Sequence, residues 1–172
     1  FDSIMEDNNI GTLLREYARN AAVDGDGAMH TYFDPDVETV QSAKGAIKTE
    51  IVENTRVFFG NPNDRRVQTQ PHIIISSREI VDEVRDRAKE KGNADWELII
   101  PDSNDNTNNT AIESDDKVTV LLRYRRDRKT GKIFACECTK TAEIRAEWDT
   151  GLTRYPITWL NWDYIQDSYH GQ

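Results

Sequence analysis

Residues 117–148 read KVTVLLRYRRDRKTGKIFACECTKTAEIRAEW, and this stretch decides the fold class. Along 117–125 apolar and polar side chains alternate, which is the period of a half-buried strand. A polar turn with a late glycine, 127–131, leads into a second alternating segment at 132–140. Residues 141–148 repeat the alternation. Three consecutive strands joined by short connections predict an antiparallel β-meander in the C-terminal half of the chain.

Two segments have the spacing of amphipathic helices. Apolar residues recur at i, i+3, i+4 and i+7 along 10–23, and Gly25 follows that stretch. A second stripe covers 77–91, where Ser76 with Glu79 three residues later predicts a capping box and Gly92 predicts the end. The prediction is an α+β fold with an antiparallel or mixed sheet and two main helices at about 10–23 and 77–91.

Further strands are predicted at Ala28 to Phe33, Gly45 to Glu53 and His72 to Ile75, with a short apolar run at 57–59. Residues 101–116 contain almost nothing apolar and predict a long mobile loop. A chain of 172 residues suits one domain, so 1–172 is predicted to be a single α+β domain. Division into two subdomains at the loop is the alternative.

The composition excludes several classes of protein. The chain has 22 basic and 31 acidic residues, a net charge of −9, which argues against a protein that grips nucleic-acid phosphates. No apolar run approaches the ~20 residues of a membrane helix, and no signal peptide is visible. The first residue is Phe1, so we expect a fragment of a longer protein. Two cysteines make no disulfide framework, which favours a cytosolic origin.

Two groups of oxygen-bearing side chains are candidate metal sites. Carboxylates can hold Mg²⁺ or Ca²⁺, and the first group is Asp24, Asp26, Asp34 and Asp36. The alternative for it is ordinary Asp-Gly and Asp-Pro turn chemistry, which we prefer. The second group has the spacing of a calcium loop: Asp102, Asn104, Asn106, Asn108, Thr110 and Glu113. Thr107 stands where that loop needs glycine, so a solvated loop is preferred.

Cys136 and Cys138 place two thiols on one face of a strand. A zinc site needs two more ligands, and His30, His72 and His170 are remote in sequence and unpaired. We therefore expect two buried cysteines that act as small apolar residues. No nucleophile motif and no phosphate-binding glycine loop occurs in the sequence. No catalytic residue, cofactor site or metal site is predicted, and the chain is expected not to be an enzyme.

Two surface features could serve contacts. Basic residues gather at the hairpin of the meander and could touch phosphates, although a solvated turn that blunts the sheet edge is preferred: Arg123, Arg125, Arg126, Arg128, Lys129 and Lys132. Aromatic residues gather toward the C-terminal end and could belong to the core or to an interface: Trp148, Tyr155, Trp159, Trp162 and Tyr164.

The order of several segments resembles the portal protein of tailed bacteriophages, in the form common in phages and prophages of Gram-positive hosts. The resemblance covers most of the chain outside 101–116 and lies in structural signatures. The residues that carry it are DGDGAMHTYFD at 24–34, GAIKTEIVENT at 45–55, VFFGNP at 57–62, QPHIII at 70–75, YPI at 155–157, NW at 161–162 and SYHGQ at 168–172.

The resemblance implies a homo-oligomeric ring, typically a dodecamer, at one vertex of the capsid. It implies capsid, scaffolding, terminase and head-completion proteins as partners. Double-stranded DNA would pass through the channel without sequence-specific binding. The family has no enzymatic activity, and its stem helices follow a segment like Gly171-Gln172. The chain would therefore be the wing, which lacks the stem, clip and crown.

The resulting prediction is a non-catalytic part of a phage portal ring, the conduit for DNA packaging and ejection. It would lie in the virion, at the portal vertex, and in the host cytoplasm during assembly. No membrane partner and no cofactor are expected. Two alternatives stay open: a bacterial adaptor that adds a peptide strand at a sheet edge, and a metal-dependent hydrolase that uses Asp24, Asp26, Asp34 and Asp36.

Overall fold

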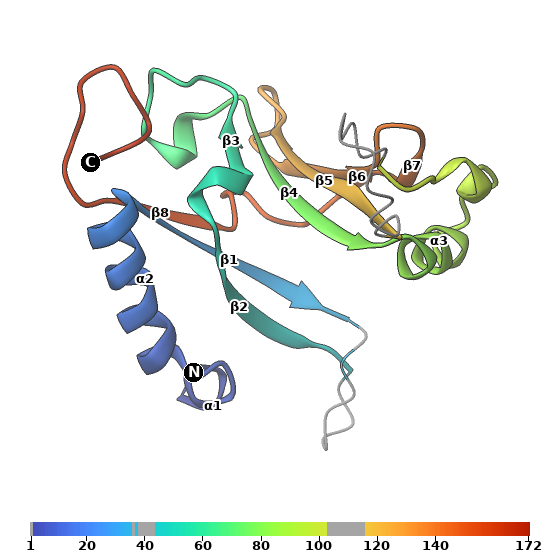
Figure 1. Cartoon of the computed structure of the whole chain (residues 1–172), viewed down its shortest axis with the longest axis horizontal. Helices are drawn as coiled ribbons and strands as arrows, with labels where there is room; N and C mark the ends of the chain where they lie inside the picture. The colour runs from blue at the N-terminus through green and yellow to red at the C-terminus, as the bar shows by residue number, and fades with distance from the viewer. Residues whose placement is uncertain (1, 36, 38–43, 103–115) are drawn as a thin grey trace, which may run out of the picture. The chain divides into compact units, whose positions relative to one another are not determined.

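The computed structural model describes residues 2–35, 37, 44–102 and 116–172. The chain divides into two compact units (Figure 1): unit 1 is formed by residues 1–71 and 154–172, and unit 2 by residues 72–153. Unit 2 is therefore an insertion between two parts of unit 1. The sequence offered 101–116 as a possible division, but that segment belongs to unit 2. Most of the predicted mobile loop, 103–115, lies outside the described residues.

Unit 1 combines two helices with a three-stranded antiparallel sheet of order β2-β1-β8. Its elements are α1 (Asp2–Asp7), α2 (Ile10–Asp24), β1 (Asp26–Asp34), β2 (Ala46–Val52), β3 (Val57–Phe59) and β8 (Ile157–Asn161), with 3-10 turns at Asn54–Arg56 and Val67–Thr69. The predicted helix at 10–23 and the strands at 28–33 and 45–53 are confirmed, with boundaries shifted by one or two residues.

Helix α2 packs against β1 through Tyr17 and Ala21, the two residues of α2 that are buried. Burial raises the pKa of Tyr17 to about 12. A Cβ atom on Gly27 would come within 2.9 Å of the Tyr17 ring, so only glycine lets the ring lie this close to the strand. The second Asp-Gly pair of the sequence is therefore a packing position in a strand and not the turn that was predicted.

Asn8, between α1 and α2, covers part of the outer edge of β2. Its Nδ2 donates to the Ile47 carbonyl at 2.8 Å, and its Oδ1 accepts from the Thr49 amide at 2.8 Å. The side-chain amide thus makes the two bonds that a neighbouring strand would make. An unpaired strand edge is a template for unwanted pairing, and this contact occupies it locally.

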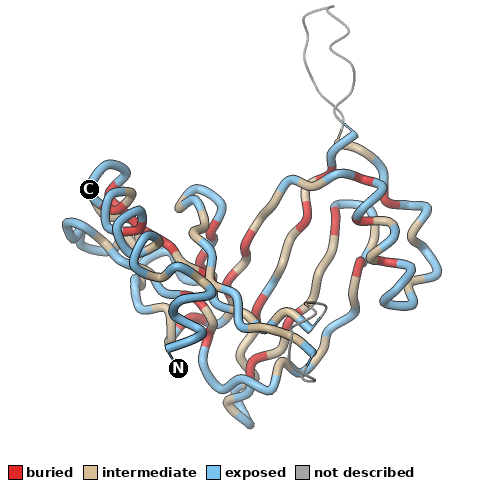
Figure 2. Tube along the Cα trace, turned by 90° about the horizontal axis from the view of Figure 1, so that it is seen from below, coloured by how far each residue is buried: buried red, intermediate tan, exposed pale blue. Residues whose placement is uncertain are grey.

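The described residues of unit 2 form an antiparallel sheet with one helix. Strands β4 (His72–Ile80), β5 (Lys117–Arg126), β6 (Ile133–Cys138) and β7 (Glu143–Asp149) are neighbours in chain order. Helix α3 (Val81–Glu90) and a 3-10 turn (Trp96–Leu98) follow β4. The β-meander predicted from 117–148 and the α+β fold class are confirmed. Buried positions are interspersed with more exposed ones along these strands, and Figure 2 shows the burial of each residue along the trace.

The start predicted for the second helix is wrong. Residues Ser76 to Ile80 continue β4 and pair with Leu121 to Lys117 of β5, and α3 begins at Val81. The predicted capping box does not form, because Ser77 donates to Glu79 at 2.6 Å within the strand. The five residue pairs that Ser76 to Ile80 make with β5 stabilise the strand more than one side-chain cap would stabilise a helix start here. The end is confirmed: Gly92 has φ 80 and donates to the Lys89 carbonyl.

The core of unit 2 lies between α3 and one face of the sheet. Val81, Val84 and Ala88 of the helix pack against residues of β5 and β7, with Ile99 between them. Ile80, which the sequence placed in the same apolar stripe, is 45% exposed because it belongs to the strand. Within the described ranges, no helix has both the length and the hydropathy needed to cross a membrane.

Candidate functional site

A buried polar site of unit 1 lies where α2 turns into β1. Helix α2 ends at Asp24, and Gly25 takes the left-handed conformation with φ 83 that starts the turn. Asp26 is then the first residue of β1 and stands opposite Asn161 of β8. The chain after β8 returns to the same place, so residues from both ends of unit 1 converge on Asp26.

The Asp26 carboxylate is the centre of this site. It is 2% exposed and accepts three hydrogen bonds. Its Oδ1 accepts from Asn161 Nδ2 at 2.8 Å and from the Gly171 amide at 2.7 Å, and its Oδ2 lies 2.6 Å from His170 Nδ1. A buried carboxylate needs such donors because burial without them is costly. We call these four residues the Asp26 cluster.

The His170 ring is the accessible part of the Asp26 cluster. Its side chain is 44% exposed, whereas that of Asp26 is 1% exposed. When Nδ1 donates to the carboxylate, the second ring nitrogen, Nε2, is left as an acceptor. A carboxylate–imidazole pair of this kind can orient a base or fix a strand end. Here the contacts of His170 and Gly171 with Asp26 bind the last residues of the chain to the first residue of β1.

Two glycines allow the backbone to close over the Asp26 cluster. A Cβ atom on Gly25 would lie 2.7 Å from the Gly171 carbonyl oxygen. A Cβ atom on Gly171 would lie 2.5 Å from the Gly25 carbonyl oxygen and 2.6 Å from that of Asp163. Because these neighbours are backbone atoms, they cannot move aside as a flexible side chain could. Both positions therefore require glycine.

Three packed aromatic side chains, Phe59, Trp159 and Tyr169, lie next to the Asp26 cluster. The Tyr169 ring stacks on Phe59, with centroids 4.6 Å apart, and contacts Trp159 at 5.7 Å. Trp159 Nε1 and Asn161 Nδ2 both donate to the Tyr169 carbonyl, at 3.0 and 2.7 Å. Burial raises the pKa of the Tyr169 hydroxyl. Aromatic packing and hydrogen bonds thus hold the same segment.

The loop between β3 and the insertion joins this arrangement. The Tyr169 amide donates to the Pro62 carbonyl at 3.0 Å. Gln70, 1% exposed, accepts from the Asn61 amide at 2.8 Å and donates to the Asp64 carbonyl at 2.6 Å. Tyr155 donates its hydroxyl proton to the Gln70 carbonyl at 2.8 Å. The buried glutamine therefore shapes the loop from inside.

Asp64 fixes the same loop from its outer side. Its carboxylate accepts from the Arg66 amide, from the Arg66 guanidinium at 2.9 and 3.0 Å, and from the Thr69 hydroxyl at 2.7 Å. These hydrogen bonds, led by those from Arg66, hold the pKa of Asp64 well below its usual range. The carboxylate stays ionised across the physiological range and keeps the loop closed.

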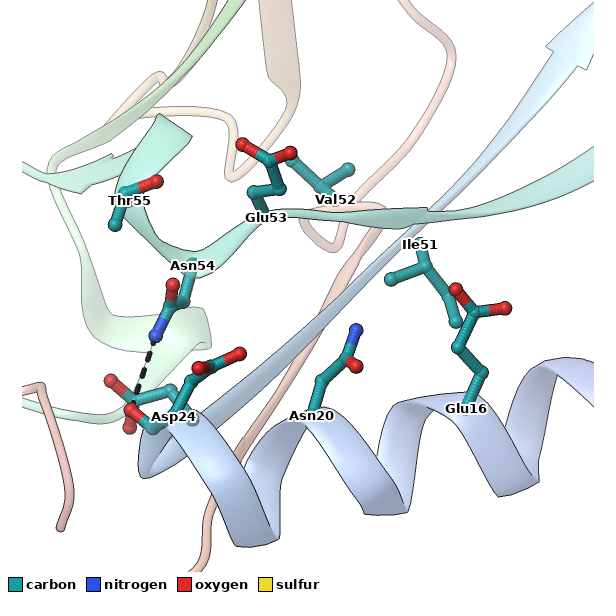
Figure 3. Close-up of a pocket in the computed structure, with 9 residues that line it drawn as sticks. Glu16, Asn20, Asp24, Ile51, Val52, Glu53, Asn54 and Thr55 are labelled. Atoms are coloured by element: carbon teal, nitrogen blue, oxygen red, sulfur yellow. Dashed lines mark hydrogen bonds between the residues drawn. The ribbon is translucent and has the colours of Figure 1, made fainter.

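An open pocket of about 540 Å³ lies beside α2 (Figure 3). Its wall carries acids and amides, and the Ile51 side chain points toward α2. The lining residues are Glu16, Asn20, Asp24, Asp26 and residues 51–55. Asn54 donates to the Asp24 carbonyl at 3.4 Å, the contact drawn in Figure 3. The pocket is acidic and suits a positively charged group better than a phosphate.

The four aspartates proposed as a metal cluster do not form one. Asp26 and Asp34 are the two ends of β1, which places them roughly 27 Å apart at the rise of an extended strand. Asp26 is committed to three donors, and Asp34 lies 2.5 Å from Lys48. Asp36 lies outside the described residues. The arrangement required by the hydrolase alternative is therefore absent from the described part of the chain.

Two of the three histidines, which no spacing in the sequence connects to a partner, lie against carboxylates in the structure. His170 pairs with Asp26, and His30 Nδ1 lies 3.5 Å from Glu50 Oε1. Asp26 and His170 are 144 positions apart in the sequence. No spacing rule connects residues so distant, so the sequence held no signal for this pair. The Asp-Gly pairs indicated a turn, but not the partner of its carboxylate.

The remaining candidate sites have mixed outcomes. Two buried cysteines were expected at 136 and 138; in the structure Cys136 and Cys138 are free thiols and half-buried. Of the calcium-loop residues, Asp102 accepts from the Thr119 amide and hydroxyl at 2.8 and 2.7 Å. The others, Asn104, Asn106, Asn108, Thr110 and Glu113, lie outside the described residues.

The basic hairpin is partly neutralised by β7. Arg125 makes a two-pronged ion pair with Glu147, at 2.6 and 3.1 Å, and Lys132 lies 2.6 Å from Asp149. These pairs favour the interpretation of a solvated hairpin over that of a phosphate-binding one.

The aromatic residues of the C-terminal end do not form one group. Trp148 belongs to β7 of unit 2, where the Arg145 guanidinium lies 3.7 Å from its ring. Tyr155 is 3% exposed and belongs to the core of unit 1. Trp162 is 61% exposed and Tyr164 52% exposed. Of these residues, Trp162 and Tyr164 in the segment after β8 are therefore the ones with exposed side chains.

Comparison with known proteins adds no family. No family model matches the chain, and no curated protein matches it.

Proposed function

We propose that the chain is the wing region of a tailed-phage portal subunit, a non-catalytic part of the ring through which DNA enters and leaves the capsid. One observation supports this proposal most. The segments that carry the resemblance are far apart in the sequence, yet their residues are bonded to one another. Asp26 binds His170 and Gly171, and the Tyr169 amide donates to Pro62.

The nature of these bonds supports a mechanical role. The residues that make these contacts hold segments of the backbone together. They are a buried carboxylate with three hydrogen-bond donors, a buried side-chain amide inside a loop, and two glycines in backbone contact. Contacts of this kind stabilise the shape of a subunit, as a structural role requires. In the resembled family, stem helices follow a segment like Gly171-Gln172. The Asp26 cluster would then hold the base of the stem rigidly to the wing.

The segment after β8 is the best candidate for a contact with a neighbouring subunit. Trp162 and Tyr164 are exposed, and the Arg65 guanidinium lies 4.0 Å from the Tyr164 ring. Exposed Trp, Tyr and Arg are the residues that most often anchor protein interfaces. A closed ring uses heterologous contacts, in which this surface would meet a different one on the next copy.

The test uses the complete gene product that contains this chain. Native mass spectrometry and negative-stain imaging of the purified protein are expected to show a closed ring with a central channel. The chain 1–172 alone is expected to be monomeric or weakly associated. A stable monomer or dimer of the complete protein at micromolar concentration would contradict the proposal and would turn attention to the adaptor hypothesis.

A pair of variants of the complete protein tests the contact surface. Trp162→Ala is expected to shift the ring toward smaller species, with an unchanged melting temperature of the subunit. The matched control is Leu14→Ala on α2, where the leucine is also exposed, at 47%, and lies outside the proposed contact. The idea fails if both variants form rings to the same extent as the unchanged protein.

A further inference from the structure

The two cysteines of unit 2 share one face of the sheet. Glu137, between them, points toward α3, because its Oε2 lies 3.9 Å from Arg87 Nε. Neighbouring residues on a strand point to opposite faces, so Cys136 and Cys138 point away from α3. The pairing of β6 with β5 is regular here, with Arg123 opposite Cys136 and Leu121 opposite Cys138, whereas the pairing of β6 with β7 shifts register on both sides of Glu137. Both thiols are free and half-buried.

The spacing of the two thiols favours a bridging ion over a disulfide. Residues two apart on a strand have Cα atoms roughly 6.7 Å apart, at the upper limit of the distances that a disulfide spans. An ion bound at about 2.3 Å to each sulfur asks only for a sulfur separation of about 4.6 Å, which two side chains on one face can reach. The spacing of the two residues along β6 therefore suits a dithiolate chelate better than a disulfide.

Charges around the thiols set the cost of ligation. Burial raises the pKa of both thiols, so both are protonated near neutral pH. Arg123 faces Cys136 across the ladder and favours a thiolate, whereas Glu143, opposite Cys138, and Glu147 oppose it. An ion must displace the protons, and the Arg123 charge offsets part of the negative charge that ligation creates.

We propose that Cys136 and Cys138 form a two-coordinate site for one soft cation, with Cu(I) as the representative ion. Soft thiolates select Cu(I), and a pair of sulfurs suits it better than zinc, which takes four ligands. Two S–H bonds are broken, two Cu–S bonds form, and two protons leave to solvent. No electron is transferred. The site is independent of the proposed portal function.

The experiment titrates the reduced chain with Cu(I) under anaerobic conditions against a chromogenic Cu(I) chelator, and native mass spectrometry counts the bound ions. We expect one copper per monomeric chain and an affinity that rises with pH, because binding releases protons. Cys136→Ser and Cys138→Ser are each expected to lose stoichiometric binding. Arg123→Gln is expected to weaken binding roughly tenfold, as loss of an outer contact typically does. Arg123→Lys retains the charge and most of the affinity.

Controls separate this site from other sulfur ligands and from misfolding. Met5→Leu removes a thioether elsewhere in the chain and is expected to bind copper normally. In the unchanged protein, one equivalent of Cu(I) is expected to protect both cysteines from alkylation by iodoacetamide, a readout that needs no variant. Binding that survives either serine variant, copper that links two chains, or unprotected thiols would each overturn the proposal.

Discussion

Asp26 illustrates how one residue can determine a site through bonds that the sequence does not reveal. Its carboxylate is buried and has donors from Asn161, His170 and Gly171, all more than a hundred positions away. Its neighbour Asp24 is exposed and ends a helix. The two aspartates look alike in the sequence, as members of one Asp-Gly repeat, but the fold gives them opposite environments.

The contrast between the two aspartates gives the first prediction. Asp26→Asn removes the charge that strengthens three hydrogen bonds, and we expect it to lower the free energy of unfolding by about 1.5–3 kcal/mol. Asp24→Asn is the matched control and is expected to change it by less than about 0.5 kcal/mol, as for most surface substitutions. Urea unfolding followed by tryptophan fluorescence measures both. Equal effects would contradict the role given to Asp26.

Gly171 gives a second prediction at this scale. In Gly171→Ala the new methyl group meets the Gly25 and Asp163 carbonyl oxygens, so we expect a loss of about 1–3 kcal/mol in unfolding free energy. Gly11→Ala is the control, because nothing lies within 4 Å of its Cβ position and it stands in α2. There alanine is expected to stabilise the helix by up to about 1 kcal/mol. An unchanged free energy of unfolding for Gly171→Ala would contradict the close backbone contact.

Strand β4 shows at the scale of elements where local signals fail. Ser76, Glu79 and the stripe from Ile80 to Ala88 are typical of a helix start, yet the segment up to Ile80 pairs with β5. The sheet partner follows 37 to 45 positions later in sequence, beyond the reach of a capping rule. Elements whose structure follows from their own periodicity, such as α2 and β5, were predicted correctly. The error arose where pairing with a distant strand determined the structure of the segment.

The helix boundary leads to a third prediction. Val84 is 0% exposed in the core under α3, so Val84→Ala is expected to cost about 2–3 kcal/mol of unfolding free energy. Ile80→Ala removes more carbon atoms, but from a side chain that is 45% exposed, and is expected to cost less than about 1 kcal/mol. Thermal or urea unfolding measures the loss of stability in both variants. A larger loss for Ile80→Ala than for Val84→Ala would contradict the exposed position of Ile80.

At the scale of the whole molecule, both units hold carboxylates whose pKa is lowered by hydrogen bonds. Asp64 lies in unit 1, where the Arg66 side chain is the main cause. Glu147 and Asp149 lie in unit 2, beside Arg125 and Lys132. The charged form is thus favoured by the folded state. The stabilisation is present above the unfolded pKa of about 4 and is lost as the pH falls further.

This distribution gives a fourth prediction. The urea midpoint is expected to fall steeply below about pH 4, and Asp64→Asn is expected to flatten part of that fall while lowering stability at pH 7. Glu97→Gln, on an exposed residue of the 3-10 turn in unit 2, is the control and is expected to leave the profile unchanged. If the urea midpoint of Asp64→Asn fell with pH as steeply as that of the unchanged protein, the hydrogen bonds of Asp64 would not link its protonation to folding.

Fold class and candidate site differed in how far sequence could predict them. The meander and α2 follow from local alternation and helical spacing, which act over a few residues. The Asp26 cluster depends on segments that only the completed fold brings together. The Gln68–Tyr155 contact is of the same kind: Gln68 Nε2 donates to the Tyr155 carbonyl at 3.1 Å, and the Tyr155 amide donates to Gln68 Oε1 at 3.0 Å.

The contact between Gln68 and Tyr155 joins the two segments of unit 1 on either side of the inserted unit 2. The insertion has a consequence for folding during synthesis. Residues 1–71 emerge first, but β8 and the donors to Asp26 are made only after all of unit 2. During that interval the acid has none of its three partners. The inserted unit, whose strands are neighbours in chain order, can form in the meantime. We therefore expect folding to finish first in the inserted unit 2, whereas unit 1, whose synthesis begins first, is completed only when β8 and the residues after it are made.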